Sequence, residues 1–137
     1  MADSLTPERR SANMAKIRAK HTKPEMLVRR MVHGMGFRYR LHRKELPGKP
    51  DLVFGPRRKV IFVHGCFWHL HECRDGRVPA SRRDYWKPKL LRNKQRDAEQ
   101  LADLQAAGWQ VLIIWECETK DLNALQNRLR LFLETEK

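Results

Sequence analysis

The stretch from residue 63 to residue 73 concentrates side chains that bind metal ions. It reads VHGCFWHLHEC and contains three histidines, two cysteines, one glutamate and two large aromatic residues. Cys66, His71 and Cys73 lie within eight residues, so their sulfur and nitrogen atoms can reach one ion if the chain turns back on itself. Three cysteines and one histidine form a closed tetrahedral set for Zn²⁺, and such sets usually stabilise a fold.

The third cysteine of this set has to come from elsewhere in the chain. Cys117 follows an apolar run at 109–116, and it lies beside Cys66 if that run and the run at 60–64 are neighbouring strands. Ordinary buried thiols beside exposed histidines are the alternative explanation. The rival ligands within the same stretch are His64, His69 and Glu72. The number and type of the ligands favour zinc.

A second group of polar residues suggests a site for a hard cation. Asp51 follows the turn sequence PGKP and opens a short apolar strand, and His64 ends the next apolar strand. A carboxylate in this place can bind Mg²⁺, which makes a bound water more acidic. A nearby histidine can act as a general base or acid. Phosphodiester hydrolysis needs these parts, although a capped turn beside surface histidines would leave the same pattern.

The composition limits the classes of function. A length of 137 residues indicates one domain, and a hydrophobic share of 41% excludes general disorder. The formal net charge of +13 favours a polyanionic partner, with nucleic acid as the first candidate. The apolar runs are too short to span a membrane, and the N-terminus lacks the apolar core of a signal peptide. We therefore expect a cytosolic protein without disulfides, since its three cysteines are an odd number.

Hydrophobic periodicity predicts an α/β domain with a mixed sheet flanked by helices. Helix start signals at Thr6 and Thr22 predict two helices, and a basic loop carrying Tyr85 and Trp86 is expected at 75–87. Trp109 and Trp115 are expected in the core. The predicted strands lie at 37–42, 51–54, 60–64 and 109–116, and two more helices precede Gly108 and cover 122–132.

Six motifs occur in an order and spacing that resemble one family. They are RSANM at 10–14, PGKPD at 47–51, FVHGCFWHLHEC at 62–73, VPASRRDYW at 78–86, RNKQRD at 92–97 and GWQVLIIWEC at 108–117. Together they resemble the very-short-patch repair (Vsr) endonucleases, which are mismatch-specific nicking enzymes. The resemblance covers most of the chain. It implies one nuclease domain over 1–137 with a restriction-endonuclease-like, PD-(D/E)xK-type three-layer fold and a structural zinc site.

The resemblance also implies which residues are catalytic. Asp51 would bind the catalytic Mg²⁺ together with the backbone carbonyl of Val63. His64 would replace the lysine of the wider nuclease fold. His69 would be the general base that activates water, and Asp97 would orient it. The zinc set implied by the family is Cys66, His71, Cys73 and Cys117, in agreement with the spacing argument.

Three positions qualify this assignment. Glu25 falls on an active-site position of the family, but Thr22 and Glu25 have the spacing of a capping box, which explains this glutamate without catalysis. Val63 stands where the family pattern has a threonine, and Leu70 stands where it has a histidine. A carbonyl ligand at Val63 does not depend on its side chain.

The resemblance places DNA contacts on aromatic rings and on a basic N-terminal arm at 1–20. Rings can wedge between base pairs and kink the duplex, and a mismatch lowers the cost because the step is already weakened. Core packing is the alternative for the rings, and a solvated basic arm with phosphate contacts is the alternative for 1–20. The residues concerned are Arg10, Asn13, Met14, Phe67, Trp68 and Trp86.

The resemblance therefore implies a Mg²⁺-dependent endonuclease that nicks one strand of DNA beside a T:G mismatch. By resemblance, such mismatches arise by deamination of 5-methylcytosine, which links the enzyme to a cytosine-5 DNA methyltransferase in DNA repair. We expect a monomer, with no membrane partner, in the bacterial cytosol with the nucleoid. The alternatives are a restriction-type nuclease of the same fold and a non-catalytic, zinc-stabilised DNA-binding module.

Overall fold

A computed structural model describes residues 22–69, 71–73 and 76–135. In these residues the chain forms a mixed sheet with helices on both faces. The elements are α2 (Lys23–Gly34), β1 (Arg40–Leu41), β2 (Leu52–Phe54), β3 (Lys59–His64), α3 (Arg83–Ala106), β4 (Gln110–Trp115), η2 (Glu116–Lys120) and α4 (Leu122–Glu134). The expected mixed α/β architecture is confirmed. The helix expected after Thr6 lies outside the described residues.

The strands are ordered β1-β2-β3-β4, and β3 is the strand that leads into the site. The pairs β1–β2 and β2–β3 are antiparallel, whereas β3 and β4 are parallel. A parallel pair needs a long crossover, which α3 provides. The register places Val63 opposite Ile114 and His64 opposite Trp115. The carboxyl ends of β3 and β4 therefore lie side by side, and the segments that carry the cysteines begin there.

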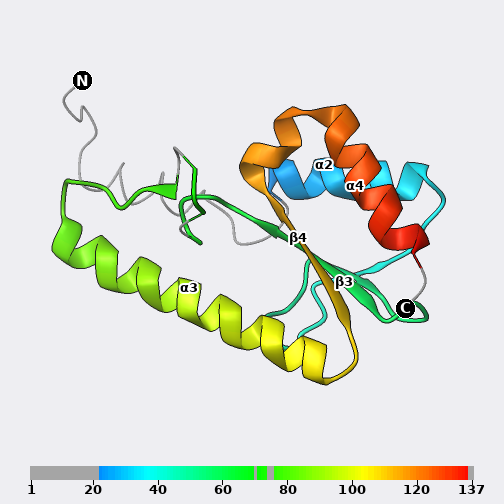
Figure 1. The fold of residues 1–137 in the computed structure, drawn as a ribbon, viewed down its shortest axis with the longest axis horizontal. Coiled ribbons are helices and arrows are strands. Elements are labelled where there is room, and N and C mark those ends of the chain that lie inside the picture. Colours follow the sequence, from blue (N-terminus) through cyan, green and yellow to red (C-terminus); the bar gives the residue numbers. More distant parts are fainter. Residues whose placement is uncertain (1–21, 70, 74–75, 136–137) are drawn as a thin grey trace.

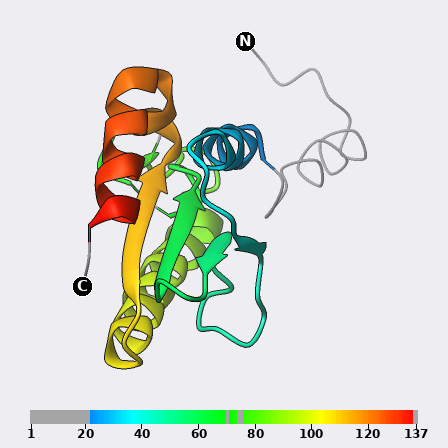
Figure 2. The same ribbon diagram turned by 90° about the vertical axis from the view of Figure 1, so that its right-hand side faces the viewer.

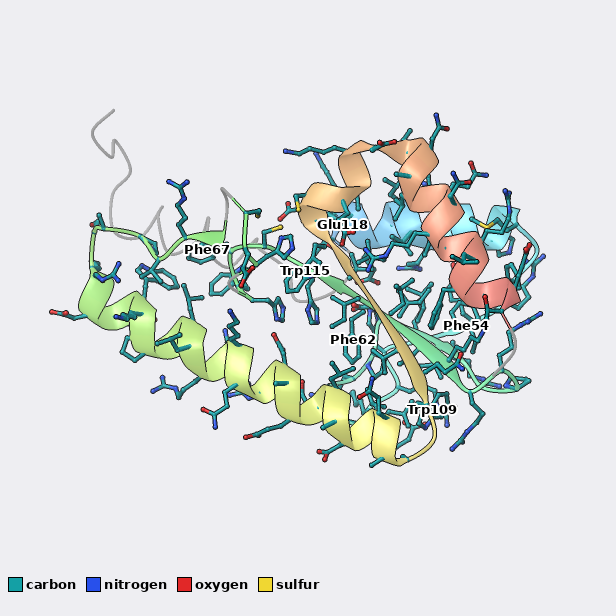
Figure 3. The ribbon with its side chains drawn as sticks, viewed as in Figure 1. Phe54, Phe62, Phe67, Trp109, Trp115 and Glu118 are labelled. Atoms are coloured by element: carbon teal, nitrogen blue, oxygen red, sulfur yellow. The ribbon has the colours of Figure 1, made fainter. Side chains whose placement is uncertain are left out.

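Helices α2 and α4 cover one face of the sheet and α3 covers the other (Figures 1 and 2). Successive strand residues point to opposite faces, so Phe54 packs toward α4 and Phe62 toward α3 (Figure 3). The core under α2 and α4 consists of Val28, Val32, Leu52, Phe54, Ile61, Ile114, Leu125, Leu129 and Leu133. The core on the α3 side consists of Val53, Val60, Phe62, Leu104 and Trp109.

Helix α2 begins and ends at the residues that its sequence predicts. Thr22 is the N-cap, and its hydroxyl oxygen accepts from the backbone N–H of Glu25 at 3.3 Å. Pro24 occupies the first turn, where a missing N–H costs nothing. Gly36 follows the helix with φ of +95°, a conformation that favours glycine. These signals fix the position of Glu25 on the buried face of α2.

A buried lysine joins β3 to the end of α4. The Lys59 ammonium donates to the carbonyl of Phe132 at 2.5 Å and also to the carbonyl of Thr135. These carbonyls lie in the last turn of the helix or just beyond it, where backbone acceptors lack partners within the helix. Lys59 therefore stabilises the C-terminus of α4.

Three sequence-based expectations differ from the structure. The strand expected at 37–42 pairs only at Arg40–Leu41, although Phe37, Tyr39 and Leu41 do pack on one core cluster. Trp86 lies in the first turn of α3 and not in a loop, because the helix already begins at Arg83. Trp115 is only half-buried and packs against histidines. In the part of the chain that the structure describes, no helix is long and apolar enough to cross a membrane.

Candidate active site and metal centre

Asp51 and Glu25 form a buried carboxylate pair at the start of β2. Glu25 is 1% exposed and Asp51 is 8% exposed. Glu25 comes from α2, and its carboxylate oxygen Oε2 lies 2.9 Å from His42 Nε2. His42 Nε2 also lies 3.6 Å from Asp51 Oδ1. One ligand atom from each of the three residues lies within 4.8 Å of the others, a separation that suits a shared metal ion.

The structure separates the two roles considered for Glu25. Its backbone N–H completes the N-cap of α2 with Thr22. Its carboxylate oxygen Oε2 contacts His42 Nε2 and also lies 3.5 Å from Arg29 Nη1. The cap therefore accounts for the backbone of Glu25, whereas the buried carboxylate belongs to the group around Asp51.

Asp51 is held in place by β3. Its Oδ2 accepts from the backbone N–H of Val63 at 2.6 Å. Burial raises the pKa of Asp51 to about 7, the Val63 N–H lowers it, and the neighbouring Glu25 raises it. A carboxylate that is costly to ionise in the protein is well suited to a cation, which would supply the missing countercharge. The donor set of two buried carboxylates therefore fits a divalent metal.

His69 and Asp97 form a close pair on the α3 side of the sheet. His69 Nδ1 and Asp97 Oδ2 are 2.5 Å apart, and the two residues come from the turn after β3 and the middle of α3. The His69 ring stacks on His64, with centroids 3.8 Å apart and planes 4° from parallel. This pair leaves His69 Nε2 as the nitrogen that can take a proton from water, since Nδ1 faces the carboxylate.

His64 connects this pair to the carboxylates, because it follows Val63 in β3. Burial lowers the pKa of His64 to about 4; His69 lowers it further, and Asp97 opposes the change. His64 is therefore a neutral imidazole near neutral pH. It does not bring the permanent charge of the lysine whose place the resemblance gives it. Its Nδ1 is buried and has no hydrogen-bond partner among the residues described.

The three cysteines and His71 converge as the sequence predicted. One ligand atom from each of Cys66, His71, Cys73 and Cys117 lies within 4.8 Å of the others. His71 Nδ1 is 3.7 Å from Cys66 Sγ and 3.4 Å from Cys117 Sγ. Burial raises the pKa of the thiols of Cys66 and Cys117. Because a metal ion supplies the positive charge that thiolates need, the chemistry of this set fits a tetrahedral metal site.

The turn between these ligands carries an aromatic cluster. Phe67, Trp68 and Trp86 pack edge to face, with centroid separations of 5.0 to 5.7 Å. The Lys89 Nζ atom lies 5.7 Å from the centroid of the Trp68 ring and 5.8 Å from that of the Trp86 ring. Figure 3 shows Phe67 above the first half of α3, away from the two cores. The cluster is therefore built between the turn and α3 and not within the main core.

The structure thus places each predicted site residue that it describes in one of the carboxylate, histidine, cysteine or aromatic groups, which are linked through β3 and the turn after it. The predicted DNA contacts Arg10, Asn13 and Met14 lie outside the described residues. Sequence analysis missed His42, which it covered only as the last residue of the strand expected at 37–42. Its position at the end of FRYRLH, shortly before PGKPD, was the available signal, but a single histidine in such a strand is weak evidence.

Comparisons with known proteins agree with one another. The sequence model of the family "DNA mismatch endonuclease Vsr" matches residues 2–75. Type II nicking enzyme V.XorIIP of Xanthomonas oryzae pv. oryzae is 54% identical over 134 residues, which cover 98% of each chain. DNA mismatch endonuclease Vsr of Escherichia coli is 43% identical over 117 residues, or 85% of this chain and 75% of the relative. Type II nicking enzyme V.NmeAIP of Neisseria meningitidis is 43% identical over 94% of this chain and 92% of its own length.

Proposed function

The chain belongs to the DNA mismatch endonuclease Vsr family, and from that premise we propose that it nicks one strand of duplex DNA beside a T:G mismatch. The observation that supports this most directly is that strand β3 connects the buried carboxylate of Asp51 to the His69–Asp97 pair. Asp51 accepts from Val63, the next residue is His64, and His64 stacks on His69, which faces Asp97. Hydrolysis of a phosphodiester requires both parts.

The catalytic metal in this proposal is Mg²⁺, held by Asp51 and the Val63 carbonyl, with Glu25 nearby. When bound, Mg²⁺ supplies charge stabilisation at the scissile phosphate and makes water more acidic. The protein's own residues do the remaining work. His69 takes the proton of the attacking water at Nε2, and Asp97 holds the ring so that this nitrogen faces the substrate.

The proposed structural ion is Zn²⁺, bound by the cysteines and His71. It would fix the turn that presents both His69 and the aromatic cluster. Phe67, Trp68 and Trp86 would enter the duplex at the mismatch, where unstacking costs less than in paired DNA. The fold that we propose for this arrangement is the restriction-endonuclease-like fold, formed by residues 1–137 as one domain.

The biological setting is also part of the proposal. A T:G mismatch is the product of deaminating 5-methylcytosine opposite guanine, so the enzyme would act at sites of a cytosine-5 DNA methyltransferase. We propose that it acts as a monomer and that it works in the bacterial cytosol, where the chromosomal DNA is found.

A nicking assay on end-labelled duplexes tests the proposal. Duplexes with one T:G pair in several contexts, including methyltransferase sites, are compared with fully matched duplexes, with Mg²⁺ and with EDTA. We expect a Mg²⁺-dependent nick only beside the mismatch, and none with Asp51→Ala, which keeps DNA binding. Cleavage of both duplexes would indicate a nuclease without mismatch preference. Tight binding without cleavage in any context would indicate a DNA-binding module.

A further inference from the structure

The imidazole of His42 lies beside the buried carboxylates of Glu25 and Asp51. Its Nε2 lies 2.9 Å from Glu25 Oε2 and 3.6 Å from Asp51 Oδ1, and its side chain is only 17% exposed. The two carboxylates come from α2 and from the start of β2, whereas His42 directly follows β1. Three separate elements therefore direct a nitrogen and two oxygen donors to one point.

The backbone of His42 supports this placement. Its φ is +46°, in the left-handed region that residues with a Cβ rarely adopt. Its N–H donates to the carbonyl oxygen of Asp51 at 3.3 Å. The backbone bond and the side-chain contact thus connect the same two residues, and the position of the imidazole is coupled to that of the metal-binding carboxylate.

The donor separations fit one six-coordinate ion. Ligands of a small divalent cation lie at about 2.0–2.1 Å, so that adjacent corners of its octahedron are about 3 Å apart. The separation of 2.9 Å between His42 Nε2 and Glu25 Oε2 matches this edge, whereas the 3.6 Å to Asp51 Oδ1 lies between the edge and the separation of opposite ligands. All three donor atoms lie within 4.8 Å of one another, which is close enough for a small adjustment to bring them onto one ion.

We propose that the Glu25 carboxylate and His42 Nε2 join Asp51 as side-chain ligands of the catalytic metal and that His42 raises the preference of this site for Mn²⁺ over Mg²⁺. The inference rests on the proposed nuclease function, and it adds the metal specificity of that site. Oxygen donors suit both ions, but an imidazole nitrogen favours first-row transition metals over Mg²⁺. A site with this nitrogen should therefore bind Mn²⁺ in preference to Mg²⁺ more strongly than a site with oxygen donors alone.

His42→Gln tests the assignment, because glutamine keeps a hydrogen-bond donor for Glu25 and removes the aromatic nitrogen. The matched control is His33→Gln, since His33 is an exposed histidine at the end of α2. Metal binding is measured by calorimetry on zinc-loaded protein. We expect His42→Gln to weaken Mn²⁺ binding at least roughly tenfold and Mg²⁺ binding less than about threefold, with no change for the control. Equal losses for both ions would reduce His42 to a positioning residue and overturn the proposal.

A spectroscopic readout on the unaltered protein does not depend on the folding of a variant. Electron spin echo envelope modulation of bound Mn²⁺ detects a directly coordinated imidazole nitrogen. We expect this modulation in the zinc-loaded protein, a change in its frequency after ¹⁵N-histidine labelling, and its loss in His42→Gln. Absence of nitrogen modulation in the unaltered protein would refute the ligand role.

The ligand role of His42 and the nuclease function can be refuted separately. If the protein nicks T:G duplexes with Mg²⁺ but shows no nitrogen coupling, only the assignment of His42 is wrong. If Mn²⁺ binds through His42 but no duplex is cut with either metal, the proposed nuclease function is wrong and the metal site remains.

Discussion

Ionisation of the buried Asp51 carboxylate lowers the stability of the folded protein, and a bound cation would offset this loss. The pKa of Asp51 is raised to about 7 from an ordinary value of 3.8, mainly by burial. Below pH 3.8 the carboxyl is protonated in both the folded and unfolded states. As the pH rises toward 7, the unfolded chain releases this proton while the folded protein keeps it, so that stability falls. The residue that we propose as a ligand of the catalytic metal thus opposes folding of the metal-free protein at neutral pH.

Asp51→Asn should therefore abolish nicking and stabilise the protein that carries zinc but no other divalent ion. Asparagine keeps an oxygen for the Val63 N–H and removes the ionisation, so we expect a gain of about 1–3 kcal/mol in unfolding free energy at pH 8. The gain should vanish near pH 4. Urea unfolding at both pH values measures it, with the exposed Asp103→Asn as control. An equal stability change at both pH values would contradict this explanation.

We expect the contact between His69 and Asp97 to affect the rate of nicking more than the affinity for DNA. The carboxylate faces Nδ1 at 2.5 Å and so determines which nitrogen of His69 is available to water. Asp97→Asn should lower kcat by roughly 10²–10⁴-fold and leave DNA affinity within about threefold. Single-turnover nicking and equilibrium binding separate the two quantities. Asp103→Asn, on the same helix, is the control, and a loss confined to affinity would count against orientation of a base.

At the scale of elements, the thiol and histidine set connects two chain segments that follow neighbouring parallel strands. Cys66, His71 and Cys73 follow β3, whereas Cys117 lies in η2 after β4. The start of η2 is held by the Trp115 N–H, which donates to Glu118 Oε1 at 2.9 Å; Figure 3 shows both residues at the end of β4. A metal at this point would fix the turn that carries His69 relative to the sheet.

Cys117→Ser should remove bound zinc and lower the unfolding free energy by at least about 4 kcal/mol, because loss of a metal is among the few causes of effects of that size. Metal content by mass spectrometry and thermal unfolding with and without a zinc chelator measure both effects. The chelator should destabilise the unaltered protein and leave Cys117→Ser unchanged. Thr119→Ser, in the same 3-10 helix, is the control. One zinc per chain retained in Cys117→Ser would exclude this ligand set.

The parts of the candidate site that lie in one continuous segment were easier to predict from the sequence than those formed by residues from several elements. The residues 66–73 form one dense segment, and Cys117 follows a strand whose parallel pairing with β3 could be expected. His42 and Glu25 meet through packing of α2 on one face of the sheet, which no local pattern encodes. Similarly, the alternation at 37–42 predicted the buried face correctly but not the short pairing of Arg40–Leu41, because pairing depends on the neighbouring strand.

At the scale of the whole molecule, the charge of the chain is uneven between its parts. Residues 1–20 contain five basic and two acidic residues, so that their removal lowers the net charge of +13 by three. Through this charge, the proposed N-terminal arm would contribute to the attraction of DNA.

Deletion of residues 1–20 should weaken DNA binding far more than it changes stability. We expect affinity to fall at least roughly tenfold at moderate salt, and the slope of log affinity against log salt to decrease by about one for each lost phosphate contact. Thermal unfolding should change little. A full-length variant with Arg9, Arg10 and Arg18 replaced by glutamine separates charge from other contacts of the arm. Unchanged affinity in the truncated protein would refute the arm's role, and an unchanged slope with lower affinity would place its contacts on the bases rather than on phosphates.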